Sequence, residues 1–451
     1  MGTADVNLVG MALRGMAKRA LVRPEDIRGL RRYVMHNLVH DFARGLIVEA
    51  GKNVHDLSAK WLASTVHYAN RYGLDSTDAH DHLELGIGNF IGAAAWAAET
   101  GQWVEVDQLA MALHESSGFI LRRGNASQAV GLLRLGVEAA RQLGDRAREG
   151  LQVGNLGSAL FGISEYKQAI EHYRVALEIA RELGDRINES RWTGALGLVY
   201  DSLGQFAEAI RCYEDAICID RSIGNRRGEG KWLGSAAGSY RLTGNAALAV
   251  EYYEEAIRIA RELNDRVNEG VHLSNLGNAH RTWGDYQQAI EYYNQAIEIA
   301  RETGDKATEA RAAINSARLF ARLGQPEKGL EVCDAGLDLF TQIGFRSGQA
   351  YAHGYKGEIF RALHRNEEAR TETELALGIH REIHALNGQA DWLHNLGLWA
   401  AEDGDLEEGI RLLTEALRIR KELGIVKAEE TKVVLTRFGS QATVDSAKST
   451  S

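Results

Sequence analysis

The sequence predicts an all-α protein: a right-handed solenoid of about eight helix pairs, preceded by a small helical N-terminal region. Three observations predict this fold. The 451 residues include 48 glycines but only 2 prolines, so little in the chain interrupts helices. Apolar residues recur at spacings of three and four, which is the period of amphipathic helices. A tripeptide of the Leu-Gly-Asp type recurs at a fixed interval, from Leu143 to Leu183 and onward, without insertion or deletion.

This repeat sets the expected helix boundaries. Each period predicts a helix A, as over residues 188–203, followed by a helix B, as over 206–221. Gly224 suits the left-handed residue that ends helix B, and Asn225 suits the N-cap of the next helix A. Pro326 falls in the first turn of a helix B, where its missing N–H costs no hydrogen bond. The tripeptides begin at Leu143, Leu183, Ile223, Leu263 and Thr303, with degenerate copies at Ile343, Ile383 and Leu423.

Charged residues recur at both helix ends. Glutamate stands in the first turn of helix A, where the helix dipole favours an anion. Arginine stands near the end of helix B, where the dipole favours a cation. The two columns are Glu149, Glu189, Glu229, Glu269 and Glu309, and Arg141, Arg181, Arg221, Arg261 and Arg301.

Three further columns contain only Gly, Ala or Ser in every repeat. Glycine inside a helix costs about 1 kcal/mol relative to alanine, so its recurrence indicates close helix crossings. We therefore expect Gly197 and Ala216 to be wedged between helices, with Tyr213 filling the core beside them. The columns are Ser117, Gly157, Gly197, Ala237, Gly277, Ala317, Gly357 and Gly397; Ala129, Ala169, Ala209, Ala249, Ala289, Gly329, Ala369 and Gly409; and Gly136, Ala176, Ala216, Ala256, Ala296, Gly336, Ala376 and Ala416.

This pattern resembles the tetratricopeptide repeat over residues 106–425. Its 40-residue period is similar to the variant of kinesin light chains, Leu-Gly-Asn spindle adaptors and bacterial signalling ATPases. The segments Asn275-Leu276-Gly277-Asn278 and Asn395-Leu396-Gly397 match that variant's signature. The proline with which the family ends helix B is absent, and the Gly-Asp turn replaces it.

The N-terminal part resembles a different element of those ATPases. Residues 33–43, with the sequence Tyr-Val-Met-His-Asn-Leu-Val-His-Asp-Phe-Ala, resemble the closing segment of the winged helix in NB-ARC-type signal-transduction ATPases. Asn37 replaces the aspartate of that family. Residues 89–97, followed by Gly101 and Trp103, resemble the helices that lead into the sensor repeats. The resemblance implies the sensor region of a STAND-type switch without its ATPase.

These observations divide the chain into four parts. Residues 1–50 are expected to form a partial winged-helix-like helical segment, and 51–105 the connecting helices. Residues 106–425 form the repeat array. Residues 426–451 are expected to be a capping helix over Val426 to Phe438 and a disordered tail from Gln441.

Composition narrows the function classes. The formal net charge of −10 argues against nucleic acid, and no apolar stretch is long enough to span a bilayer. No signal peptide is visible, so we expect a cytoplasmic protein. Cys212, Cys218 and Cys333 are interpreted as buried thiols rather than a disulfide framework.

No catalytic, metal or cofactor site emerges from the motifs, and we expect no enzyme. Gly224 to Lys231 is glycine-rich, but it lacks the spacing and the hydroxyl of a phosphate loop. His36 and His40 have the spacing of a zinc protease, but Asn37 stands where its glutamate would be. His380 and His384 share this spacing and are interpreted as surface residues.

The most informative signal lies on helix A, whose exposed side lines the concave surface in tetratricopeptide proteins. The family's groove positions correspond here to cations and amides, which would attract an acidic ligand. Alternatively, some of these arginines pair with Glu or Asp of the neighbouring repeat. Trp192, Trp232 and Trp392 stand beside them as core or rim residues. The ligand-binding candidates are Arg191, Lys231, Arg241, Asn275, Asn278, Arg281, Arg311, Asn315, Arg318, Arg322, Arg361 and Asn395.

The leading hypothesis is a protein- or peptide-binding module that acts as a sensor or adaptor through this groove, with an acidic extended peptide or a protein as partner. Two alternatives remain open. One is a structural scaffold that bridges two proteins, which would leave the groove empty. The other is a regulator that binds nucleotide or nucleic acid.

Overall fold

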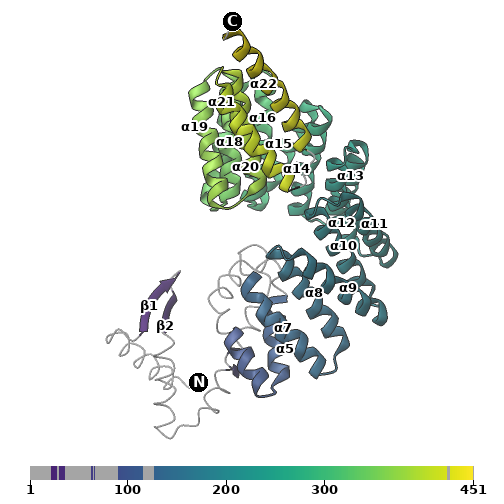
Figure 1. The fold of residues 1–451 in the computed structure, drawn as a ribbon. Helices are drawn as coiled ribbons and strands as arrows, with labels where there is room; N and C mark the ends of the chain where they lie inside the picture. The colour runs from purple at the N-terminus through teal and green to yellow at the C-terminus, as the bar shows by residue number, and fades with distance from the viewer. Residues whose placement is uncertain are drawn as a thin grey trace. The chain divides into compact units, whose positions relative to one another are not determined.

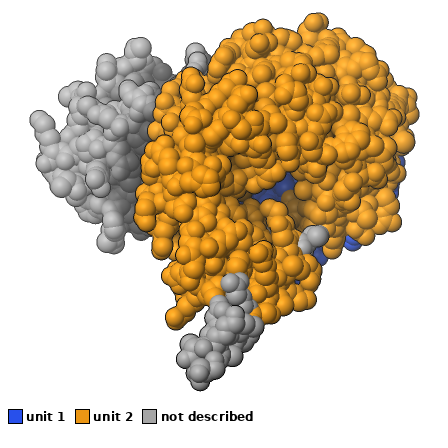
Figure 2. Space-filling view, turned by 90° about the horizontal axis from the view of Figure 1, so that it is seen from above, with its two compact units in different colours: residues 1–184 blue, residues 185–451 orange. Residues whose placement is uncertain are grey.

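A computed structural model describes residues 22–27, 30–35, 62–63, 65–66, 90–114, 126–423 and 427–449. They belong to two compact units, residues 1–184 and 185–451 (Figure 2). The first unit contains β1 (Val22–Ile27), β2 (Leu30–Met35), α5 (Trp103–His114), α7 (Ala126–Gln142), α8 (Arg146–Gly162) and α9 (Tyr166–Leu183). Residues 90–99 are also helical.

The second unit is a continuous series of antiparallel helices (Figure 1). It consists of α10 (Arg186–Ser202), α11 (Phe206–Ile223), α12 (Arg226–Leu242), α13 (Ala246–Glu262), α14 (Arg266–Trp283), α15 (Tyr286–Thr303), α16 (Lys306–Arg322), α17 (Pro326–Gln342), α18 (Arg346–Ala362), α19 (Asn366–Glu382), α20 (Leu386–Glu402), α21 (Leu406–Glu422) and α22 (Lys427–Ser449). Even-numbered helices from α8 to α20 are helices A, and odd-numbered helices from α7 to α21 are helices B. The predicted all-α solenoid of tetratricopeptide helix pairs is confirmed in the array.

The described N-terminal strands differ from the helical segment expected within residues 1–50. β1 and β2 pair antiparallel, with Val22 opposite Met35 and Ile27 opposite Leu30. Only two residues, ending in Gly29, separate the strands, and such a spacing is a hairpin signal. The helical interpretation missed this signal. The segment from His36, with the His36–His40 pair, lies outside the described residues.

The turns between repeats have the predicted chemistry. Gly184 and Gly224 end their helices with φ of 66° and 70°, in the left-handed region that glycine adopts without strain. Asp185 accepts a hydrogen bond from the backbone N–H of Asn188, and Asn225 accepts one from that of Gly228. Pro326 occupies the first turn of α17.

The small-residue columns lie at the helix crossings, as predicted. Ala216 is fully buried, and a Cβ added to Gly197 would lie 2.6 Å from the Tyr213 ring. Gly277 has the same relation to Tyr293. Glycine at Gly197 and Gly277 therefore lets the tyrosine of the same repeat pack directly on the helix A backbone.

The charged columns form a lattice of ion pairs across each inter-repeat turn. Glu229 is only 1% exposed, and it accepts hydrogen bonds from Arg221 at 2.6 Å and from Arg226. Arg226 also contacts Glu262 of the next helix B at 2.6 Å. Analogous pairs recur along the array; they are Arg141–Glu149, Arg146–Glu149, Arg261–Glu269, Arg266–Glu269, Arg266–Glu302 and Arg301–Glu309.

The substitution Glu229→Gln is expected to lower the free energy of unfolding by about 2 kcal/mol, because it weakens two charge-assisted hydrogen bonds to a buried acceptor. Glu262→Gln is a matched control, since it removes the other carboxylate that binds Arg226. The Glu262 side chain is 47% exposed, so its loss should cost no more than about 0.5 kcal/mol. Urea unfolding followed by circular dichroism measures both. Equal costs would contradict the assigned role of Glu229.

The helices A lie on the inner side of the second unit. Consecutive helices A contact one another, as α12 does with α10 and α14, and α16 with α14 and α18. Consecutive helices B are in less extensive contact within the described array. Their surfaces therefore diverge, and the helices A line the narrower face. We call the surface of α10, α12, α14, α16 and α18 on this face the A groove.

The array ends on α22, which packs against α21 and α20. Arg420 of α21, which is 3% exposed, bonds to both neighbouring helices. It donates to Asp391 of α20 at 2.7 Å and to Thr431 of α22. Phe438 is buried against Ala401 and Leu413. α22 thus covers the end of the core, as expected of a capping helix. It continues to Ser449, however, so the tail expected to be disordered from Gln441 is helical to that residue, because no proline or Gly-Asp stop interrupts it.

Two smaller findings concern the cysteines and the membrane. All three cysteines are free, but only Cys333 is buried; Cys218 is exposed on α11, so its interpretation as a buried thiol is wrong. Its place on the helix face opposite Ala216 accounts for the exposure. Within the described residues, no helix has the length and apolar character needed to cross a bilayer.

Candidate functional site

A cavity of about 830 Å³ lies in the A groove over α10, α12 and α14. The helix between the others, α12, makes it hollow, because its groove-facing residues are small. Gly238 stands where α10 has Leu198 and α14 has Asn278. A Cβ added to Gly238 would meet only the Tyr253 hydroxyl, at 3.5 Å, so there is room for a larger side chain.

Three cations line this cavity: Arg191 of α10, and Arg227 and Lys231 of α12. Arg191 of α10 and Lys231 of α12 are both exposed, and both rest on tryptophan rings. The Lys231 ammonium lies 4.1 Å from the centre of the Trp232 ring. The surrounding groove walls and the charge of Arg191 lower the pKa of Lys231 to about 8, although Asp220 opposes the shift. Lys231 forms no ion pair with an acidic side chain of the described residues.

Acidic residues lie deeper in the same wall. Asp220 is completely buried and accepts hydrogen bonds from Ser190 at 2.7 Å and Asn225 at 2.8 Å. Burial raises the pKa of Asp220, although the hydrogen bonds from Ser190 and Asn225 oppose the shift. Asp201 accepts from Ser239 at 2.6 Å, and burial raises its pKa too. Both carboxylates are hydrogen-bonded within the array, and Arg191 and Lys231 line the cavity.

His272 of α14 forms part of the opposite wall and is 8% exposed. Burial lowers its pKa to about 4, so the ring is neutral at physiological pH. Its ring packs on Gly234 of α12, where a Cβ would overlap it. Asn275, one turn further along α14, adds an amide to the lining.

The predicted groove residues divide into two groups. Arg191, Lys231 and Asn275 meet at this cavity. Arg311 is exposed in the same column on α16 and donates to Thr308, while Asn315 is half-buried on that helix. Arg241 and Arg281 are half-buried and interact with Tyr253 and Tyr293 respectively.

The remaining candidates are engaged within the array. Arg318 pairs with Glu358 at 2.5 Å, and Arg361 pairs with Asp403 at 2.7 Å. For these two, the alternative of pairing between neighbouring repeats is confirmed. The other engaged contacts are Arg322 to Tyr286 at 2.9 Å, Asn395 to Glu358 at 3.1 Å, and Tyr293 to Asn278 at 2.8 Å.

The tryptophans beside the groove belong to the core. Trp192, Trp232 and Trp392 are each 2% exposed. Trp232 packs on Gly194 and Trp392 on Gly354, so each ring occupies the place of a side chain on the preceding helix A. Large and small residues alternate between repeats here, which fixes the spacing of the helices A.

His380 is a correction to the sequence interpretation, because it is completely buried rather than at the surface. The Trp392 indole N–H donates to its Nδ1 at 3.0 Å, and the two rings stack. Gly388, eight residues later, leaves the space that the imidazole fills. His384 is exposed as predicted. Within the described part of the chain, no cluster of three His, Cys, Asp or Glu residues could hold a metal ion.

Several cavity residues escaped the sequence interpretation. Asp220, Asp201, Gly238 and His272 were not recognised. A signal for Asp220 existed: its column otherwise holds alanine in the neighbouring repeats, at Ala180 and Ala260. A charged residue in such a column marks a local departure from the packing rule.

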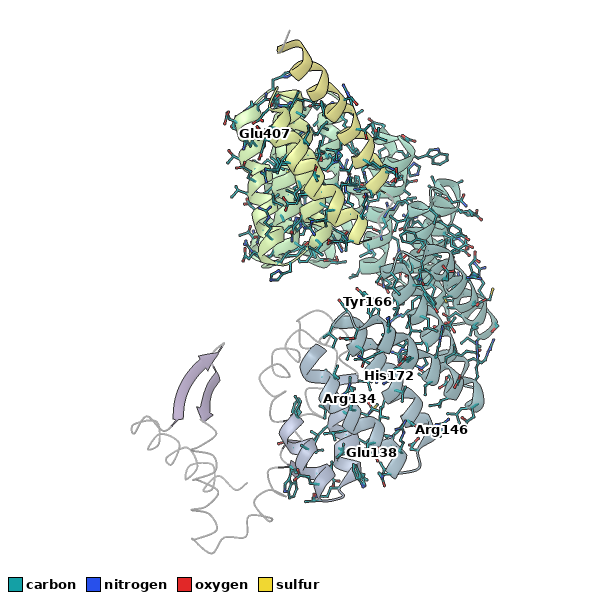
Figure 3. The ribbon with its side chains drawn as sticks, in the orientation of Figure 1. Arg134, Glu138, Arg146, Tyr166, His172 and Glu407 are labelled. Atoms are coloured by element: carbon teal, nitrogen blue, oxygen red, sulfur yellow. The ribbon has the colours of Figure 1, made fainter. Side chains whose placement is uncertain are left out.

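The first unit has a smaller cavity of about 460 Å³ between α7 and α9. Arg134 and His172, labelled in Figure 3, line it together with Val137 and Val175. It contains no candidate residue from the sequence analysis.

Comparison with known proteins agrees with the repeat architecture. Tetratricopeptide repeat families match residues 150–222, 230–302 and 389–423. No curated protein sequence matches the chain.

Solved structures are similar at low sequence identity. A signal-transduction ATPase with numerous domains and a tetratricopeptide repeat sensor, from Pyrococcus horikoshii, matches with a TM-score of 0.53 and 18% identity, over 94% of this chain and 60% of that one. Aspartyl phosphate phosphatase F from Bacillus subtilis matches with a TM-score of 0.54 and 12% identity, over 82% and 95% of the two chains.

The Rap conjugation gene regulator of plasmid pLS20, in complex with the Phr* peptide, matches with a TM-score of 0.52 and 14% identity, over 76% of this chain and 96% of that one. At such identities the likeness establishes the fold alone. Together with the family matches and the helix-pair packing, it shows that this chain is a tetratricopeptide repeat protein.

Proposed function

We propose that this chain binds an extended peptide segment in the A groove, and that the segment places an acidic group between Arg191 and Lys231. The observation that carries the proposal is the cavity of about 830 Å³, with Arg191 and Lys231 in its lining. Lys231 has no ion pair with an acidic side chain of the described residues, and burial by the groove walls together with the charge of Arg191 lowers its pKa to about 8. A bound carboxylate would offset the repulsion from Arg191 and raise the pKa of the lysine.

The lining also suits the backbone of a peptide. Asn275 lines the cavity, and Asn315 continues its column onto α16. Asparagine amides offer both a donor and an acceptor, which an extended backbone can satisfy. The neutral ring of His272 and the small Gly238 leave space for a ligand side chain between these polar groups.

A screen of labelled nonapeptides by fluorescence polarisation tests the proposal. We expect acidic peptides to be retained, and the double variant Arg191→Glu with Lys231→Glu to weaken them about 100-fold, since two charge-assisted contacts are lost. Gly238→Leu should also block binding, because the leucine side chain would fill the cavity. The helix should tolerate this change, since it removes a glycine from the helix interior.

Arg211→Glu is the matched control, because the Arg211 side chain is 71% exposed on helix B and away from the cavity. It should leave affinity within about twofold, apart from screened long-range effects. Affinity for the acidic peptides should also fall as the pH rises above about 8, where Lys231 loses its proton. Acidic peptides that bind the double variant as tightly as the parent would overturn the assignment of the groove.

We further propose that the chain acts as the sensor part of a signal-transduction ATPase. Two observations support this role: the resemblance of residues 89–97 to the connecting helices of such proteins, and the fold shared with the Pyrococcus horikoshii protein over 94% of this chain. The test is to measure ATP hydrolysis by a P-loop ATPase encoded beside this gene, with and without the chain and an acidic peptide. An unchanged rate in every combination would favour the scaffold alternative.

A further inference from the structure

A second cavity, of about 560 Å³, lies between α19 and α21, two consecutive helices B. Its floor is apolar and comes mainly from α20, with Leu396, Trp399 and Ala400, while Leu377 and Leu412 close the sides. Because helices B bound it, this cavity is separate from the A groove, and it is independent of the function proposed for that groove.

The same place in an earlier repeat of this chain is filled. There, the Tyr240 hydroxyl of α12 donates to Glu214 of α11, and its ring meets the Tyr252 ring of α13 edge-on at 5.3 Å. Four repeats later, the equivalent residues are Ala400, Glu374 and Leu412, respectively. All three line the second cavity. The acceptor carboxylate is thus retained as Glu374, whereas the donor tyrosine is replaced by Ala400.

The ring is absent near both ends of the array, where Leu160 and Ala400 stand at this position. The residue at this position is aromatic or histidine in each of the five preceding repeats, and it is alanine here. Gly378 enlarges the opening, because a Cβ added to it would have no atom within 4 Å. In those five repeats, the residues at the position of Ala400 are Tyr200, Tyr240, His280, Phe320 and Phe360.

The side chains around the opening suit a phenol ring better than a phenyl ring without a hydroxyl. Arg370 donates to Oε1 of Glu374 at 2.8 Å, and within the described chain Oε2 makes no hydrogen bond. Trp399 offers an aromatic surface, with the Arg361 guanidinium 5.9 Å from its centre. A ring on this floor would gain aromatic contact with Trp399, and a hydroxyl at its far end would find a charged acceptor.

We propose that this cavity is a docking site for a tyrosine side chain of a partner protein. The ring takes the place that Tyr240 fills in its own repeat, and the hydroxyl donates a hydrogen bond to Glu374. The partner therefore presents an exposed tyrosine to the helix B face, while the A groove remains free for its own ligand.

The probe for this site is N-acetyl-L-tyrosinamide, with N-acetyl-L-phenylalaninamide as the comparison that lacks only the hydroxyl. In protein labelled with 5-fluorotryptophan, the ¹⁹F signal of Trp399, assigned with Trp399→Phe, reports binding. We expect that signal to shift with both amides, and the tyrosinamide to bind about tenfold more tightly, since its hydroxyl meets a charged acceptor.

Three variants separate the possible outcomes. Ala400→Tyr restores the residue of the earlier repeats and should abolish binding of both amides. Glu374→Leu should remove the preference for the tyrosinamide while keeping the phenylalaninamide affinity. Tyr240→Ala should open a second site beside Glu214 and so increase the number of tyrosinamide molecules bound.

A Trp399 signal that responds to neither amide up to their solubility limit would overturn the docking site. The same conclusion would follow if Ala400→Tyr, with an unchanged circular dichroism spectrum, bound both amides as the parent does. Equal affinities of the two amides for the parent protein would overturn the role of Glu374, and with it the assignment of tyrosine.

Discussion

Replacing Trp392 by alanine is expected to lower the free energy of unfolding of the C-terminal repeats by about 4 kcal/mol. The indole is 2% exposed, and it donates to His380 at 3.0 Å. It also contacts the Tyr351 and Tyr355 rings edge-on. The space cannot collapse easily, because the surface beneath the ring is the bare backbone of Gly354, which has no side chain to move into it.

Trp283→Ala is the control for this substitution, since it makes the same chemical change at a site that is 58% exposed. It should change the free energy of unfolding by no more than about 0.5 kcal/mol. Urea unfolding, followed by far-ultraviolet circular dichroism, compares the two variants with the parent. If both variants unfolded at the same urea concentration, the stacking of Trp392 on Gly354 would not contribute the stability assigned to it.

The fold could be predicted from the sequence because a solenoid repeats its local rules. Each repeat contacts its neighbours alone, so a fixed period together with small-residue columns determines which faces meet. Gly197 against Tyr213 illustrates this, since both residues are constrained within one helix pair. The hairpin β1–β2 lies outside that periodicity, and the helical interpretation failed there.

The candidate site was only partly predictable, because it depends on partners in other repeats. Arg191 and Lys231, which share one predicted column, both line the cavity, and their role in binding stays a prediction. Arg361 belongs to a neighbouring column, yet it is neutralised by Asp403, 42 residues away. No local pattern reveals such a pair, because its formation depends on the rotamers of two long side chains.

Departures from the columns carry information that periodicity alone leaves out. A large residue in the column of Asp220 is accommodated by glycine eight positions later, as with Gly228. His380 and Gly388 follow the same rule, as do Phe340 and Gly348. The buried state of His380 was therefore encoded in the sequence, but in a pair of columns rather than in one residue. The same comparison of columns identifies the cavity at Ala400, where alanine replaces the aromatic residue or histidine of the five preceding repeats.

Protonation of His272 gives the second large expected effect. Burial holds its pKa at about 4 in the folded protein, against the usual value of 6.5. As the pH falls below 6.5, His272 therefore binds a proton in the unfolded chain but not in the folded chain. The stability due to the neutral ring is complete above pH 6.5 and is lost progressively down to pH 4. At pH 5 this loss amounts to about 2 kcal/mol.

His272→Trp is expected to remove this loss without harming the fold, because Trp232 already packs on Gly194 in the way that tryptophan would pack on Gly234. The difference in free energy of unfolding between variant and parent, measured in urea at pH 7 and at pH 5, should grow by about 2 kcal/mol in favour of the variant. Burial also lowers the pKa values of His380 and His394, but both residues are present in the two proteins and cancel.

Carboxylates, including Asp201 and Asp220 with their raised pKa values, are present in both proteins and cancel in this difference. Burial alone would raise the pKa of Glu149, but hydrogen bonds from Arg141 and Arg146 bring it below 4.5, so its contribution is lost only at lower pH. A constant difference between parent and His272→Trp from pH 7 to pH 5 would mean that the imidazole is protonated as readily in the folded chain as in water. The wall of the cavity at α14 would then be wet and charged, and the groove would be more cationic than a neutral His272 allows.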